Sequence, residues 1–150
     1  MPQSLACVDL HFIFSTKNRA AFLSDAWRPE LHAYAATMLQ NLGCYPKIIN
    51  SMPDHVHILA GLGRINSMSD VVRDVKTATS HWIKARHSQF HDFAWQNGYA
   101  VFAVSASNVK EVREYIVNQA EHHKVRSFQD EYRAFLDRHG VKFDERYVWD

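Results

Sequence analysis

The sequence predicts a single α+β domain of the ferredoxin-like type, in which a split βαβ unit forms an antiparallel sheet. Short apolar segments alternate with longer segments whose apolar residues recur every three or four positions, and the resulting order is β-α-β-β-α-β-α. The 150 residues are 47% apolar, which is enough for one core, so residues 1–150 are treated as one domain. We expect helices to cover one face of the sheet.

The first half of the chain is expected to form strand, helix, strand and strand. The short apolar and aromatic run VDLHFIF is typical of a buried strand. The helical pattern that follows ends at Gly43, a residue type that commonly terminates helices. Pro53 and Asp54 indicate a turn, so the strands on either side should pair as a hairpin. The expected bounds are residues 8–14, about 24–29 to 42, 45–52 and 55–61.

The second half is expected to form a helix, a strand, a tyrosine-bearing helix and a further short helix. Ser67 followed by Asp70 is a helix start signal, and so is Asn108 followed by Glu111. The dipeptide Asn97–Gly98 is typical of a hairpin turn. The expected bounds are residues 67–86, 99–104, 108 to about 123 and 127–139.

Composition restricts the class of protein. The formal charge of +1 gives no general excess of Lys and Arg, so any DNA-binding surface must be local. The candidate DNA contacts are Lys17, Arg19 and Lys76. Cys7 and Cys44 lack metal or redox spacing, the start lacks a secretion signal, and no apolar run approaches the ~20 residues that span a bilayer. We therefore expect a cytoplasmic protein without a membrane segment.

The first candidate site is the pair His55 and His57. Side chains alternate along a strand, so two histidines separated by one residue point to the same face. Both lie at the expected start of a strand, directly after the turn, where a site can open to solvent. A His-x-His pair alone is more often structural than metal-binding.

The second candidate site is the pair Tyr115 and Gln119, four residues apart on the predicted helix. They stack on one side of it, about 100° around the axis from its apolar stripe. The Gln119 carbonyl oxygen and the two imidazoles would give a divalent ion three ligands and leave positions open, as catalysis requires. Tyr115 would place a phenol beside a metal-polarised phosphate. A free phenol has a pKa of about 10, so it needs a charged neighbourhood to attack.

At these two motifs the chain resembles the single-tyrosine HUH transposases of bacterial insertion sequences, together with their relatives associated with repetitive extragenic palindromes. The matching stretches are PDHVHIL at residues 53–59 and YIVNQ at residues 115–119. Weaker similarity includes HFIFSTKNR at residues 11–19, WQNGY at residues 95–99 and DERYVWD at residues 144–150. The resemblance covers nearly the whole chain.

The resemblance implies that His55, His57 and Gln119 hold Mg²⁺ or Mn²⁺. Tyr115 would attack single-stranded hairpin DNA, leaving a 5′-phosphotyrosine and a free 3′-hydroxyl, and the same site could run backwards to join a new end. The resemblance also implies a homodimer, and in well-known members the tyrosine helix of one subunit completes the other's site. Imidazole nitrogen suits Mn²⁺ better than Mg²⁺, so we expect tighter Mn²⁺ binding.

The residues leave two other functions open. A non-catalytic ferredoxin-like module could bind single-stranded nucleic acid through aromatic residues on its sheet, although it gives no reason for both motifs to coexist. A hydrolase could instead use water at the same metal. The aromatic residues in question are Phe12, Phe14, Tyr99 and Phe102.

Three further histidines are kept outside the expected site. His122 and His123 could be further ligands, but they lie at a helix end, where a positive group complements the helix dipole, and we expect that role for them instead. His11 lies on the first strand, where it could face the metal or fill the sheet face.

Overall fold

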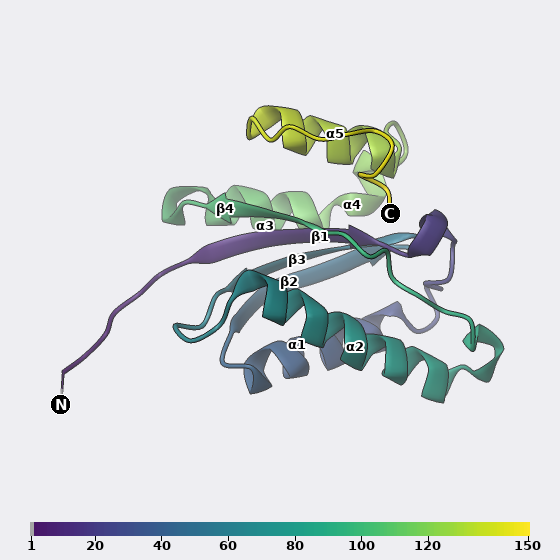
Figure 1. Ribbon diagram of the computed structural model, residues 1–150, viewed down its shortest axis with the longest axis horizontal. Coiled ribbons are helices and arrows are strands. Elements are labelled where there is room, and N and C mark those ends of the chain that lie inside the picture. Colours follow the sequence, from purple (N-terminus) through teal and green to yellow (C-terminus); the bar gives the residue numbers. More distant parts are fainter. Residues whose placement is uncertain (1) are drawn as a thin grey trace.

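The computed structural model describes residues 2–150, which form a sheet between two layers of helices (Figure 1). Short 3₁₀ turns lie at Lys17–Arg19, Ser88–Phe90 and Ala106–Asn108. The strands are β1 (Asp9–Ser15), β2 (Tyr45–Met52), β3 (His55–Gly61) and β4 (Ala100–Val104). The helices are α1 (Arg28–Asn41), α2 (Met68–Arg86), α3 (Val109–Val117), α4 (Gln119–His122) and α5 (Phe128–Arg138).

The strands form one antiparallel sheet in the order β2-β3-β1-β4. This order places β1 and β3 in the centre and leaves β2 and β4 at the edges. It confirms the predicted ferredoxin-like α+β fold, with the tyrosine-bearing helix and a further short helix added after β4. The hairpin predicted at Pro53 and Asp54 is also confirmed, because Met52 pairs with His55.

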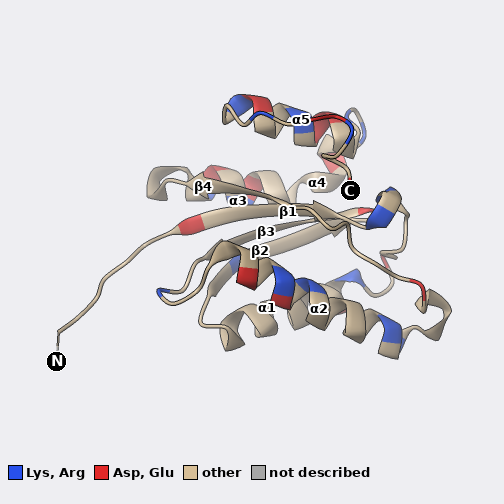
Figure 2. Cartoon of the chain, viewed as in Figure 1, with Lys and Arg blue, Asp and Glu red and all other residues tan. Residues whose placement is uncertain are grey.

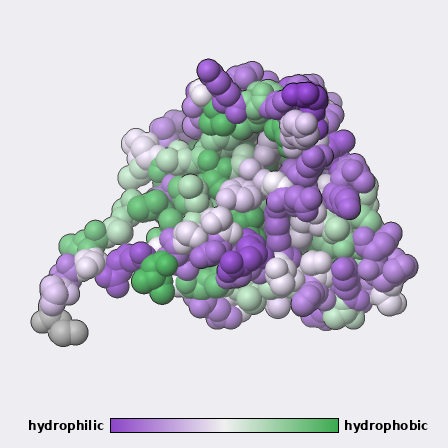
Figure 3. Space-filling model, in the orientation of Figure 1, coloured by the Kyte–Doolittle hydropathy of each residue, from purple (hydrophilic) through white to green (hydrophobic). Residues whose placement is uncertain are grey.

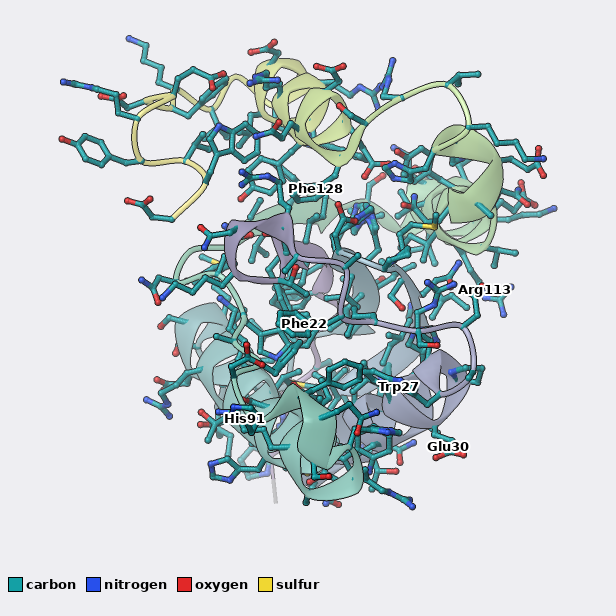
Figure 4. The ribbon with its side chains drawn as sticks, turned by 90° about the vertical axis from the view of Figure 1, so that its right-hand side faces the viewer. Phe22, Trp27, Glu30, His91, Arg113 and Phe128 are labelled. Atoms are coloured by element: carbon teal, nitrogen blue, oxygen red, sulfur yellow. The ribbon has the colours of Figure 1, made fainter. Side chains whose placement is uncertain are left out.

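Helices cover both faces of the sheet, so the prediction of one covered face is wrong. Figure 1 shows α1 and α2 on one side and α3, α4 and α5 on the other. Alternation along β1 serves both layers: Phe12 and Phe14 are buried in the core with α1 and α2, whereas Ile13 is buried in the core with α5. In Figure 4, Phe22 lies below the sheet and Phe128 above it.

The helix predicted from residue 108 to about 123 is interrupted at Asn118, which separates α3 from α4. The Asn118 backbone leaves the helical region, with φ −94° and ψ 25°. Asn50 on β2 explains the break, because its side-chain amide donates to the carbonyl oxygens of Ile116 at 2.8 Å and Val117 at 3.3 Å. In a continuous helix these carbonyls would accept from amides four residues later.

The predicted helix start is confirmed, since α3 begins at Val109 with Asn108 at the N-cap position, although the Asn108 side chain makes no capping bond. One local turn prediction is wrong. Asn97–Gly98 does not form a hairpin: β4 pairs with β1, and the Gly98 amide donates to the carbonyl oxygen of Asp150 at 2.8 Å. By contrast, two other helices have side-chain caps: the Ser67 hydroxyl accepts a hydrogen bond from the Asp70 amide at the start of α2, and the Ser127 hydroxyl accepts one from the Asp130 amide at the start of α5.

The surface carries charges of both signs. Figure 2 shows Lys and Arg interspersed with Asp and Glu in both helical layers, and Figure 3 shows hydrophilic residues over much of the visible face. Any anion-binding region is therefore local, as the formal charge of +1 indicates. In the part of the chain that is described, every helix is too short or too polar to cross a membrane.

Candidate metal and tyrosine site

Two predicted ligands lie at the start of β3, under the layer of C-terminal helices. His55 and His57 are both 0% exposed, and their ring centroids lie 5.3 Å apart. They project from the same sheet face as Ile13, which lies opposite His57 on β1. Strand alternation therefore brings the two imidazoles together, as the spacing predicts.

The third predicted ligand, Gln119, lies beside them. It is the first residue of α4, its side chain is buried, and its Oε1 lies 3.3 Å from His55 Nε2. His123 Nε2 lies 3.1 Å from the same oxygen. The structure thus brings together the three residues that the sequence motifs single out.

The structure adds Glu131 from α5 and His123 from the end of α4 to this group. Glu131 Oε1 lies 2.9 Å from His57 Nε2, 3.3 Å from His123 Nε2 and 3.6 Å from His55 Nε2. One ligand atom from each of these four residues lies within 4.8 Å of the others. Three imidazole nitrogens and a carboxylate oxygen at such separations fit one divalent ion.

Sequence reasoning missed both added residues. For His123 we expected the helix dipole rather than a ligand role, but its ring contacts Glu131 and Gln119 and joins the group that could hold a metal ion. A signal for Glu131 exists in the sequence: it lies three residues after Phe128 and beside Tyr132, on the buried stripe of α5. A carboxylate in such a position is buried only when it has partners.

The predicted nucleophile, Tyr115, lies at the edge of the same cluster in the same chain. Its hydroxyl donates a hydrogen bond to Glu131 Oε2. The Tyr115 ring stacks on the His122 ring, with centroids 4.2 Å apart. The Tyr115 and His57 ring centroids are 6.1 Å apart. Burial raises the pKa of the phenol, and the bond to Glu131 raises this pKa further. The hydroxyl therefore keeps its proton in this arrangement.

Glu131 is the charged centre of the cluster. Burial alone would raise the pKa of its carboxyl, but hydrogen bonds from His123 and His57 outweigh burial and hold this pKa well below its usual range. Burial lowers the pKa of His57 to about 4, although Glu131 opposes this shift. His57 is therefore neutral at pH 7 and can offer a lone pair to a metal. At His123 the attraction of Glu131 outweighs burial and raises the pKa.

An open pocket of about 300 Å³ lies beside the cluster. His55, His123, Arg19 and Arg126 are among the residues that line it, together with Asp54. The Arg19 backbone has a φ of 56°, an uncommon value for a residue with a side chain, and its amide donates to the Thr16 carbonyl at 3.0 Å. Arg19 lies at the wall of this pocket, and its guanidinium lies over the Trp149 ring, 5.7 Å from the ring centroid. Lys17, two residues earlier in the same 3₁₀ turn, is exposed.

Lys76 lies on α2, on the other side of the sheet from the cluster. Its ammonium donates to the carbonyl oxygens of Gln96 and Gly98, each at 2.7 Å. Burial lowers its pKa to about 8. The structure therefore gives Lys76 a bracing role for the loop before β4, and its contact with DNA stays a prediction.

Comparisons with known proteins are consistent with this architecture. The family described as "Transposase IS200 like" matches residues 5–119. A crystal structure of a candidate transposase from Deinococcus radiodurans R1 is 24% identical, with a TM-score of 0.65, and the match covers 79% of this chain and 98% of that one. A REP-associated tyrosine transposase bound to a REP hairpin is 15% identical, with a TM-score of 0.61 and coverages of 82% and 72%. A search of curated proteins found no match.

The two solved structures are less than 25% identical to this chain, so they support the fold alone. The family match is more informative because it extends over most of the chain, from the segment before β1 to Gln119. It includes the His-x-His strand and the tyrosine helix. The chain therefore belongs to the IS200-like transposase family.

Proposed function

We propose that this protein cleaves and rejoins single-stranded DNA through a tyrosine nucleophile beside a divalent metal ion. The observation that carries the proposal is the convergence of Tyr115 with His55, His57 and Gln119 in one partly closed site. Membership of a transposase family supports DNA as the target. The hydrogen bond from Tyr115 to Glu131 connects the proposed nucleophile to the proposed metal ligands.

The donor set fits a divalent metal ion. His55, His57 and His123 would supply imidazole nitrogens, Glu131 a carboxylate oxygen and Gln119 an amide oxygen. This mixed set suits Mn²⁺ better than Mg²⁺, which prefers oxygen ligands, so we propose that either ion binds and that Mn²⁺ binds more tightly. When bound, the ion would neutralise charge on the phosphoryl oxygens.

Tyr115 would attack the phosphorus of a DNA phosphodiester. The bond from its phenolic oxygen to phosphorus forms while the bond to the 3′ oxygen breaks, which leaves a 5′-phosphotyrosine and, after protonation, a 3′-hydroxyl. Glu131 accepts a hydrogen bond from the phenol and would orient the phenolic oxygen; because the lowered pKa makes this carboxylate a weak base, the proton released during attack would pass to water. Because the phosphotyrosine remains an activated ester, a 3′-hydroxyl can reverse the step and join a new end.

Single-stranded DNA with a hairpin is the proposed substrate. The similar fold of a transposase solved with a REP hairpin supports this choice. The pocket beside His55 and His123 is the proposed path for a phosphate: Arg19 and Arg126 at its wall would attract it, while the Asp54 carboxylate in the same lining would oppose it. Lys17, next to this wall, is a secondary candidate contact.

We also propose a homodimer, which the family resemblance implies. Tyr115 lies beside Glu131 of its own chain. This contact supports attack within one subunit rather than exchange of tyrosine helices between subunits.

The rival binding-module function requires aromatic side chains on an open sheet face. Helices cover both faces here, and Phe12, Phe14 and Phe102 are all buried. The burial of these three side chains counts against base stacking on the sheet and favours the catalytic proposal.

The test is formation of a covalent protein–DNA adduct. Wild type, Tyr115→Phe and the control Tyr99→Phe, a tyrosine on the other side of the sheet, are incubated with Mn²⁺ and a pool of single-stranded hairpin DNAs. Intact-protein mass should show a nucleotide adduct on wild type and on the control, and none on Tyr115→Phe. Strand cleavage retained by Tyr115→Phe would refute the nucleophile assignment and favour a hydrolase that uses water.

A further inference from the structure

His11 contacts the proposed ligand His57 on the side away from the cluster. Within the β1–β3 pair, His11 lies opposite Leu59 and His57 opposite Ile13, so the two histidines are diagonal neighbours on one sheet face. His11 Nε2 lies 2.8 Å from His57 Nδ1. The other nitrogen of His57, Nε2, lies 2.9 Å from Glu131 Oε1. Each ring nitrogen of His57 therefore has its own partner.

The proton of the His57 ring decides which nitrogen can bind a metal. A neutral imidazole has one N–H and one bare nitrogen, and only the bare nitrogen binds a metal. A metal on Nε2 therefore requires the proton on Nδ1. Because the His57 ring is fully buried, that N–H needs an acceptor inside the protein. His11 Nε2 is the nitrogen in position to accept it.

An imidazole at position 11 can hydrogen-bond to His57 both when the site is metal-free and when it holds a metal ion. Without a metal, His57 can donate from Nε2 to the Glu131 carboxylate, and His11 can then donate from its Nε2 to His57 Nδ1. With a metal on His57 Nε2, the direction of the His11–His57 hydrogen bond reverses. A carboxylate or carbonyl at position 11 could only accept. His11 can satisfy His57 in both states because it can donate or accept.

Packing holds the His11 ring in place. Its side chain is only 1% exposed, and its ring packs edge-on against Phe135 with centroids 5.2 Å apart. Phe102 lies opposite His11 on β4. An apolar side chain would fill this position equally well if packing were its only role, since a buried imidazole adds a desolvation cost. The hydrogen bond to His57 offsets that cost and gives the imidazole a specific use.

We propose that His11 is a positioning residue that holds the His57 proton on Nδ1 and directs Nε2 toward the metal. This inference rests on the proposed metal site and adds to it a residue that touches neither the ion nor DNA. Such partners fix the orientation and tautomer of metal-binding histidines.

Mn²⁺ affinity, measured by calorimetry, tests the proposal without relying on activity. His11→Phe keeps a buried ring but cannot accept a hydrogen bond, and we expect about 10–100-fold weaker binding. His11→Gln offers an amide oxygen as acceptor, and we expect affinity within about threefold of wild type. His139→Phe is the matched control, because the His139 ring also packs against Phe135, with centroids 6.3 Å apart, but contacts no proposed ligand.

A second measurement works on wild type alone and so does not depend on the folding of a variant. Nitrogen-15 NMR of the histidine rings, with Mg²⁺ at saturating concentration, should place the His57 proton on Nδ1. His11→Phe affinity equal to wild type, an equal loss in His11→Phe and His11→Gln, or a proton on His57 Nε2 would each overturn the inference. Wild type that binds no Mn²⁺ would instead refute the proposed metal site itself.

Discussion

Replacing Glu131 with alanine is the most direct test of how the cluster is built. The carboxylate is 0% exposed and accepts or shares hydrogen bonds with Tyr115, Gln119, His57 and His123. Alanine removes the one negative charge among these groups and leaves several of them without a partner. The metal-free protein should therefore lose stability.

The size of the loss follows from these contacts. One hydrogen bond to a charged group contributes about 1.5–3 kcal/mol, and breaking a buried charged pair by removing one partner costs about 3–5 kcal/mol. Tyr115 and His123 are only partly buried and can regain water, so the lower end of that range applies. We expect Glu131→Ala to lower the free energy of unfolding by about 3 kcal/mol. Glu131→Gln keeps an acceptor of the same shape and should cost about half as much.

Urea unfolding at pH 7 with a chelator measures this difference. Glu121→Ala is the matched control, because Glu121 is exposed on α4 and its side chain pairs with Lys124 at the surface. The control should unfold at the wild-type urea concentration. A loss below about 1 kcal/mol for Glu131→Ala would refute the assignment of this carboxylate as the centre of the cluster.

The same carboxylate makes stability depend on pH. Its pKa is lower in the folded protein than the ordinary value of 4.5, so its stabilisation is complete above about pH 4.5 and is lost as pH falls toward the folded-state pKa. One extra proton bound on unfolding gives a slope of about 1.4 kcal/mol per pH unit. Below about pH 4.5, wild type should lose stability more steeply than Glu131→Gln. Equal slopes would contradict the lowered pKa.

Three other changes test separate parts of the site. Gln119→Ala should weaken Mn²⁺ binding at least about tenfold, and unchanged affinity by calorimetry would remove Gln119 from the proposed ligands. Arg19→Ala should weaken single-stranded DNA binding and reduce the slope of log affinity against log salt by about 0.7, whereas an unchanged slope would exclude a phosphate contact. Asn50→Ala should cost about 1 kcal/mol in urea unfolding, and a smaller loss would mean that Asn50 does not cause the break between α3 and α4.

Features that depend on neighbours along the chain could be predicted from the sequence. His55 and His57 share a face because side chains alternate on a strand. Tyr115 and Gln119 were predicted to share a helix face, but the break at Asn118 places them on the separate helices α3 and α4. The fold class follows from the order of such segments. The break at Asn118 could not be predicted in this way, because the side chain that causes it, Asn50, comes from β2.

The prediction that helices cover only one sheet face is wrong, because every residue of β1 and β3 is buried, which requires cover on both faces. Which sheet face α3, α4 and α5 cover depends on tertiary packing after β4. Helical periodicity marks a face to bury but does not say which sheet face will receive it.

The sequence by itself determined the strand with two histidines, the helix start with its tyrosine, and the family resemblance that joins them. Only the tertiary structure decided that Glu131 and His123 complete the cluster and that His11 contacts His57. The physical reason is that these constraints act over different separations along the chain. Backbone geometry fixes the relation between residues a few positions apart, whereas docking of α5 and the register of β1 against β3 select partners far apart in the chain.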